Sequence, residues 1–175
     1  MKRATGGAVT VHVDAAPELV YALVSDVTRM GEWSPETHRC TWVGTEGPVP
    51  GARFKGYNRR GRARWSNTLV VVSAEPERQF SFRRDVLPCG VCDWRYSMEP
   101  EGEGTSLTES YEVVKPDWRI MNWFNGILLG VADRDDDLLA GMRTTLAGIK
   151  AAAEAQAGTG GSAPAGAHIT TGSER

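Results

Sequence analysis

The sequence has few of the residues on which most metalloproteins and hydrolytic enzymes depend. Three cysteines and three histidines occur among 175 residues, and His12, His38 and His168 lie far apart. A small, odd number of cysteines excludes a disulfide scaffold and fits a reducing compartment. We find no Ser-His-Asp or Cys-His set and no phosphate-binding loop, which favours binding over hydrolytic chemistry. We therefore expect no metal site and no cofactor.

Long apolar runs and a strong net charge are also missing. No stretch approaches the roughly 20 apolar residues that cross a bilayer, and no apolar segment follows the basic N-terminus as in a secretory signal. The formal net charge is -2, which does not point to a nucleic acid or an anionic membrane. These features predict a cytoplasmic protein with no nucleic-acid partner and no stable membrane insertion.

One cluster departs from this balanced charge. Its basic residues are Arg53, Lys55, Arg59, Arg60, Arg62 and Arg64. We interpret the cluster as the solvated edge of a hairpin, since a charged run is usually a solvated surface. A small anionic group on a ligand could also use it.

The length of the chain suits a single domain with a core large enough to fold alone. From about Gly158 the sequence is rich in Gly, Ala, Ser and Thr, a composition that buries too little apolar surface to fold. We predict a flexible N-terminus over residues 1–7, one domain over 8–156 and a disordered tail over 157–175.

Apolar periodicity predicts a strand and two short helices at the start of the domain. Val9, Val11 and Val13 alternate with polar residues, which predicts a strand over residues 8–15 with one buried face. In PELVYALVSD, apolar residues recur at helical spacing after a proline suited to a first helical turn. The next segment, DVTRMGEWSPE, predicts a second short helix.

Residues 37–115 then change to a period of two, interrupted by turn residues. This pattern predicts about six further strands joined as an antiparallel meander. A helical period returns after Pro116, and a terminal amphipathic helix carries an apolar stripe of Leu138, Met142, Thr145, Ile149 and Ala153. We predict an α+β fold in which a curved antiparallel sheet wraps around this helix and leaves a cavity between them.

Several of these segments resemble one known family. PELVYALVSDVTRMGEWSPE resembles the opening of the START-like superfamily, and more closely the polyketide cyclase/dehydrase-like branch of the SRPBCC proteins. AEPERQFSFR and DWRYSMEPEGEGTSLTESYEVV resemble strands of that branch, and MRTTLAGIKAAAE resembles its terminal helix. The resemblance implies a helix-grip fold, with seven antiparallel strands around the C-terminal helix and an apolar cavity. It also implies a ligand among the polyketides, sterols, lipids or quinones that family members bind, carry or cyclise.

Three functions remain open at this point. The first is a carrier or sensor that binds a small hydrophobic molecule without turnover. The second is a polyketide cyclase, aromatase or dehydratase that uses a carboxylate or a tyrosine of the pocket as acid and base. The third is a protein-interaction module.

Glu109 and Tyr96 are the catalytic candidates. If the strand face that carries Glu109 is the concave one, burial raises its pKa and suits it to proton transfer on an enolisable ligand. On the opposite face it would be a solvated sheet residue, and a salt bridge to Arg64 or Arg95 is a further alternative. Tyr96 could donate a hydrogen bond to a ligand carbonyl.

The ligand-binding candidates are aromatic, aliphatic and uncharged polar residues of the strands, the second short helix and the terminal segments. They are Trp33, Trp65, Asn67, Leu69, Trp94, Tyr96, Tyr111, Trp123, Leu138, Met142 and Thr145. Asn67 could fix the orientation of a ligand carbonyl. For Trp33 the alternative is that its ring only seals the core.

Two further motifs have a structural and a functional interpretation. The apolar cluster at residues 118–128 could be core, a lid over the pocket or a homodimer patch. Cys89 and Cys92 form a CxxC between two predicted strands, without the helix that follows a thioredoxin-like motif and without two further zinc ligands. We interpret the pair as part of a hairpin connection.

Overall fold

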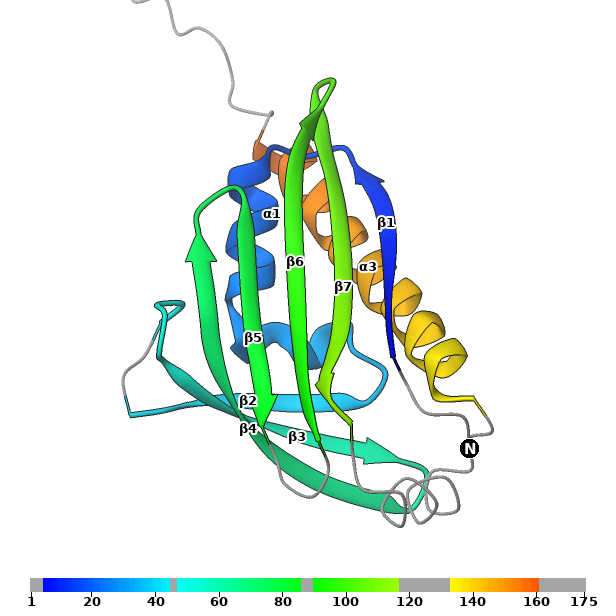
Figure 1. Cartoon of the computed structure of the whole chain (residues 1–175). Coiled ribbons are helices and arrows are strands. Elements are labelled where there is room, and N and C mark those ends of the chain that lie inside the picture. The colour runs from blue at the N-terminus through cyan, green and yellow to red at the C-terminus, as the bar shows by residue number, and fades with distance from the viewer. Residues whose placement is uncertain (1–4, 45–46, 86–89, 117–132, 161–175) are drawn as a thin grey trace, which may run out of the picture.

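A computed structural model describes residues 5–44, 47–85, 90–116 and 133–160 of the chain. It has the predicted α+β architecture, with one antiparallel sheet, two short helices after the first strand and a long helix at the end (Figure 1). In chain order the elements are β1 (Gly6–Val13), α1 (Pro17–Ser25), η1 (Val27–Glu32), β2 (Thr37–Val43), β3 (Arg53–Arg60), β4 (Ala63–Glu75), β5 (Gln79–Asp85), β6 (Val91–Glu101), β7 (Gly104–Lys115) and α3 (Arg134–Gly160).

The seven strands form one sheet in the order β1-β7-β6-β5-β4-β3-β2. Strands β2 to β7 follow one another as a meander, and β1 closes the order by pairing antiparallel with β7. Two of the hairpin turns need a left-handed backbone, which Gly61 (φ 55°) and Gly102 (φ 63°) adopt without a steric penalty. The predicted meander is therefore confirmed, and so is the helix-grip topology.

Two short helices connect β1 to β2. Pro17 stands in the first turn of α1, where its missing N–H costs no hydrogen bond, and α1 buries Val20 and Leu23. Asp26 ends α1 and begins η1, because its side chain accepts a hydrogen bond from the backbone N–H of Thr28 at 3.1 Å. η1 packs against β2.

The core lies between the concave face of the sheet and the helices α1 and α3 (Figure 1). Phe54, Phe80 and Leu107 come from the sheet, and Leu146 and Ile149 come from α3; all five are fully buried. Helix α3 packs against β1 and α1. Burial of such side chains stabilises the fold by about 1.5–3 kcal/mol each.

Trp33 holds α3 close to η1. Its ring is 7% exposed and belongs to the main core cluster. A Cβ atom placed on Gly148 of α3 would lie only 2.6 Å from the Cβ of Trp33, so the helix approaches this closely because residue 148 has no side chain. Trp33 is thus a buried contact between the end of η1 and the terminal helix.

The first strand and the last helix reach close to the ends of the described residues. β1 begins at Gly6, where it pairs with Glu112, and α3 continues to Gly160. None of the helices within the described ranges is long and apolar enough to span a membrane.

We expect Gly148→Ala to lower the melting temperature by several degrees. Alanine favours a helix interior over glycine by about 1 kcal/mol, but the added Cβ would meet Trp33 and overpack the core, at a cost of about 1–3 kcal/mol or more. Gly158→Ala is the matched control, because a Cβ there meets no atom within 4 Å. Thermal unfolding followed by circular dichroism compares the two. An equal gain in stability for both variants would contradict the close contact.

Candidate ligand-binding cavity

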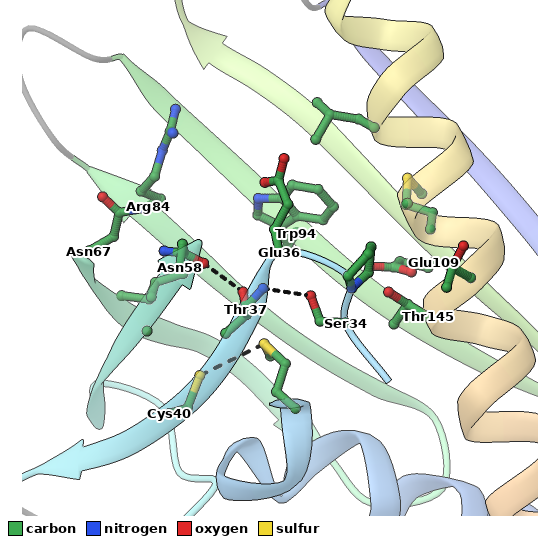
Figure 2. Close-up of a pocket in the computed structure, with 18 of the residues that line it drawn as sticks. Ser34, Glu36, Thr37, Cys40, Asn58, Asn67, Arg84, Trp94, Glu109 and Thr145 are labelled. Carbon is green, nitrogen blue, oxygen red and sulfur yellow. Dashed lines mark hydrogen bonds between the residues drawn. The ribbon is translucent and has the colours of Figure 1, made fainter. Parts of the chain in front are cut away.

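A cavity of about 420 Å³ lies between the sheet, the N-terminal half of α3 and the segment that leads into β2 (Figure 2). Its apolar wall contains Phe54, Trp65, Leu69, Phe82, Trp94, Leu138 and Met142. Its polar groups include Ser34, Thr37, Asn58, Asn67, Arg84, Tyr96, Glu109 and Thr145. The cavity is therefore mainly aromatic and aliphatic, with polar side chains at a few positions.

Most of the candidate residues meet at this cavity. Those that line it are Trp65, Asn67, Leu69, Trp94, Tyr96, Glu109, Leu138, Met142 and Thr145. Trp33 is not in the lining, because its ring is used in the contact with Gly148. Tyr111 is not in the lining either; its ring packs on Trp94 at 5.3 Å and its hydroxyl donates to Asp135. Trp123 and the rest of the 118–128 cluster lie outside the described residues.

Strand alternation brings the lining side chains together. Phe82 of β5 pairs with Trp94 of β6, and Tyr96 of β6 pairs with Glu109 of β7. Directly paired residues face the same side of a sheet, so these side chains form a continuous row across three strands. Because this face is the concave one, Glu109 points inward.

A β-bulge adds the segment before β2 to the lining. The register between β2 and β3 shifts between Thr37 and Arg39, so Thr37 and Cys40 both face the cavity although they are three residues apart. In an unbroken strand, residues three apart would face opposite sides. The hydroxyl of Thr37 donates to the side-chain oxygen of Asn58 at 2.7 Å, which fixes the orientation of that amide (Figure 2).

Glu109 and Tyr96 form a buried hydrogen-bonded pair. The Tyr96 hydroxyl donates to Oε1 of Glu109 at 3.0 Å, and the two residues are 3% and 4% exposed. The second carboxyl oxygen, Oε2, is buried and has no hydrogen-bond partner among the described residues. A buried polar atom without a partner is costly, so Oε2 is the atom at which a ligand would gain most from a hydrogen bond.

Burial changes the ionisation of this pair. It raises the pKa of Glu109 from 4.5 to about 8, because the carboxylate is removed from water; the Tyr96 hydrogen bond opposes this shift. The pKa of Tyr96 is also raised, by its own burial and by the neighbouring carboxyl group. Near neutral pH the Glu109 carboxyl is therefore mostly protonated and can donate a hydrogen bond.

The alternatives that placed Glu109 in water or beside an arginine do not hold. Arg64 and Arg95 are both exposed. Arg95 pairs with Ser110, the neighbour of Glu109, and therefore faces the convex side of the sheet. Arg64 pairs with Arg59, one position from the inward-facing Asn58.

Several polar lining residues were not among the sequence candidates, and Asn58 and Arg84 illustrate why. Asn58 belongs to the basic run that we interpreted as a solvated hairpin edge, and Arg84 belongs to the polar end of β5. Period two did contain the signal: Asn58 shares its face with Phe54, and Arg84 shares its face with Phe80 and Phe82. In both cases the sequence prediction placed the residue in solvent because its side chain is polar, although its position in the strand alternation indicated the inner face.

An ion-pair network closes one side of the cavity wall. Arg60 of β3 contacts Glu36 at 2.9 Å and forms a two-point ion pair with Asp137 of α3. These carboxylates raise the pKa of the Arg60 guanidinium further. The network ties the β3–β4 hairpin to the first turns of α3.

The described cysteines and acids do not gather as a set of metal ligands. No group of three or more His, Cys, Asp or Glu side chains suitable for a metal ion occurs within the described ranges. Cys40 lines the cavity, and burial raises the pKa of its thiol to about 12, so it remains protonated. Cys92 lies in β6, and Cys89 lies outside the described residues.

The sequence profile of one protein family, described as "Polyketide cyclase / dehydrase and lipid transport", matches residues 7–154. The chain belongs to this family. Its fold and its cavity agree with the predicted membership in the START-like superfamily. No curated protein matches the chain by sequence.

Solved structures of the family support the same assignment. The NMR structure of the Polyketide_cyc-like protein Cgl2372 from Corynebacterium glutamicum is 33% identical, with a TM-score of 0.61 over 94% of this chain and 100% of that one. A START superfamily protein from Mycobacterium smegmatis is 19% identical, with a TM-score of 0.61 over 89% and 99%. The di-domain ARO/CYC StfQ from the steffimycin biosynthetic pathway is 18% identical, with a TM-score of 0.68 over 88% and 52%. The last two likenesses concern the fold.

We expect the folded protein to lose stability as the pH rises from about 4.5 towards 8. The unfolded chain ionises Glu109 near its ordinary pKa while the folded protein keeps it protonated, so deprotonation favours unfolding across this range. Glu109→Gln should remove this part of the pH dependence. Urea unfolding at about pH 5 and about pH 8 measures it.

Glu112→Gln is the matched control, since Glu112 is exposed on the same strand. It should follow the wild-type pH dependence. If Glu109→Gln also followed the wild type, Glu109 would have an ordinary pKa in the folded protein.

Proposed function

We propose that the protein binds a small hydrophobic molecule in its cavity, as a carrier or sensor. The observation that carries this proposal is the aromatic and aliphatic lining of a 420 Å³ cavity, in which the buried Oε2 of Glu109 has no hydrogen-bond partner among the described residues. Membership in a family described by cyclase, dehydrase and lipid-transport functions supports a hydrophobic ligand.

The size and the lining of the cavity favour a compact, partly planar ligand. Ligand pockets usually measure about 300–1,000 Å³, so a volume of 420 Å³ suits one drug-sized molecule. The indole rings of Trp65 and Trp94 line it, and flat rings pack well against flat ligands. A polycyclic polyketide or a quinone fits this description better than a long acyl chain.

The polar groups favour a ligand with oxygen atoms at both ends. Asn58, Asn67 and Arg84 come from three neighbouring strands at one side of the cavity, and Glu109 and Thr145 lie at the other (Figure 2). The amide of Asn67 can donate to a ligand carbonyl, and protonated Glu109 can donate to a second oxygen. These donors would fix the direction in which the ligand lies.

A second function, a cyclase, aromatase or dehydratase, is favoured by the Glu109–Tyr96 pair. A general acid or base works best when its pKa lies near the operating pH, and burial raises that of Glu109 to about 8. Holding a flexible poly-ketone folded and dry beside this group would promote an aldol closure. In this function Glu109 exchanges a proton with the substrate, and Tyr96 orients the carboxyl through its hydrogen bond.

We expect Gly141→Phe to weaken ligand binding at least about tenfold without unfolding the protein. Gly141 of α3 lines the cavity, and a Cβ there meets only Pro35, at an ordinary 3.6 Å, so a larger side chain occupies ligand space. Ala147→Phe is the control, because Ala147 is exposed on the same helix. Titration with the neutral fluorophore N-phenyl-1-naphthylamine gives the affinities. Equal affinities in both variants would place the probe elsewhere and overturn the cavity proposal.

For the second function we expect Glu109→Gln to abolish proton transfer while it preserves probe affinity. A soluble 1,3-diketone exchanges its α-protons for deuterium, and NMR follows this exchange. Wild-type protein should accelerate it on the order of 100-fold over Glu109→Gln, with a rate that rises as Glu109 deprotonates around pH 8. A wild-type rate equal to that of the variant at every pH would leave binding as the function.

A further inference from the structure

The outer face of β2, β3 and β4 concentrates positive charge. Strand alternation turns one basic residue of β2, three of β3 and one of β4 away from the cavity. These are Arg39, Arg53, Lys55, Arg59 and Arg64, which we call the basic face. Over residues 39–43, 53–59 and 64–72 no acidic residue occupies an outward position. The formal charge of the whole chain is -2, so the cations are strongly segregated.

The charges of the basic face have no ion-pair partner in the part of the chain that the structure describes. Within the ranges that the structure describes, none of the five takes part in an ion pair, whereas Arg83 of β5 pairs with Asp93. Two of them lie over the ring of Tyr57, with Arg39 at 5.7 Å and Lys55 at 5.2 Å from its centre. A cation over an aromatic ring is attracted to the ring but keeps its positive charge.

Exposed valines lie among these charges. Val43, Val70 and Val72 are 43%, 37% and 49% exposed, and all three belong to the outward face of β2 and β4. Apolar side chains on the same face as arginines gain nothing from the phosphates of a nucleic acid. In contrast, a phospholipid surface offers both phosphate groups and an apolar boundary just beneath them.

We propose that the basic face docks the protein on membranes that contain anionic phospholipids. Its cations would contact the lipid phosphates, and its valines would contact the boundary of the acyl chains. Docking is peripheral, since it uses one face of a folded sheet and no spanning helix.

The position of the basic face also connects it to the cavity. Asn58, Arg60 and Trp65 line the cavity, while the alternate residues Arg59 and Arg64 of the same hairpin belong to the basic face. Docking would therefore bring this hairpin, and the cavity wall that it forms, to the lipid surface. If docking serves to exchange a hydrophobic ligand with the membrane, that role rests on the proposed function. Docking itself does not depend on it.

Vesicle co-sedimentation of the full chain tests the proposal. We expect binding to vesicles in which phosphatidylglycerol replaces part of the phosphatidylcholine, little binding to phosphatidylcholine alone, and a steep loss of binding as salt increases. The triple variant Arg53→Gln/Arg59→Gln/Arg64→Gln should bind at least about tenfold more weakly, because each cation near an anionic surface contributes roughly fivefold. All three side chains are exposed, so the variant should keep the wild-type melting temperature.

The control variant Arg78→Gln/Lys115→Gln/Arg143→Gln removes the same number of exposed charges away from the basic face. It should bind like the wild type. An equal loss in both triple variants would mean that overall charge, and not this face, governs binding. No preference for anionic vesicles, or capture of an RNA homopolymer or an acidic peptide in place of vesicles, would overturn the proposal.

Gly141→Phe separates this proposal from that of the cavity. It should weaken binding of the neutral fluorophore at least about tenfold and leave vesicle binding unchanged, because Gly141 lies on α3 in the cavity lining and not on the basic face. Loss of vesicle binding in this variant would mean that the cavity, and not the basic face, holds the lipid.

Discussion

The contact between Trp33 and Gly148 sets the position of the terminal helix, and the cavity depends on it. Next to this contact and beyond it, Leu146, Ile149 and Ala153 are completely buried against the core. On the N-terminal side, the helix lines the cavity with residues that include Leu138, Gly141 and Thr145. The helix contacts Trp33 closely at Gly148, and Arg60 binds its first turns through Asp137. Between these two contacts it crosses the concave face of the sheet and leaves space beneath it. The cavity exists because one part of α3 packs tightly in the core while the preceding part lines an open space.

Side chains alternate between the two sides of each strand, so each hairpin has an inner and an outer surface of different composition. In β3 and β4 the inward residues form the cavity wall and the outward residues carry positive charge. The same alternation buries Glu109 between apolar neighbours, which separates its carboxyl from every arginine on the convex face. The raised pKa of Glu109 is therefore a consequence of sheet geometry together with the depth of the cavity.

The fold could be predicted from the sequence because its signals are local and repeated. Alternating valines, turn glycines and a helical stripe specify each element, and the antiparallel meander follows from short connections. The site was predicted only in part. Periodicity groups Glu109 with Tyr111 but cannot say which face is concave, and a bulge such as that at Thr37 leaves no clear mark in the sequence. Arg84 and Asn58 were missed because their polarity suggested solvent.

The pairing of β1 with β7 has a consequence for how the chain is made. Val9 pairs with Glu109, so 100 residues separate two neighbours in the finished sheet. Ribosomes add roughly 5–20 residues per second, so the first strand waits on the order of 5–20 s for its partner. During that time its valines and its unpaired backbone edge can pair with other chains. The sheet is complete only when almost the whole domain has emerged from the ribosome. The alternate threonine and histidine of β1 make this waiting strand less prone to aggregate than a continuous apolar one.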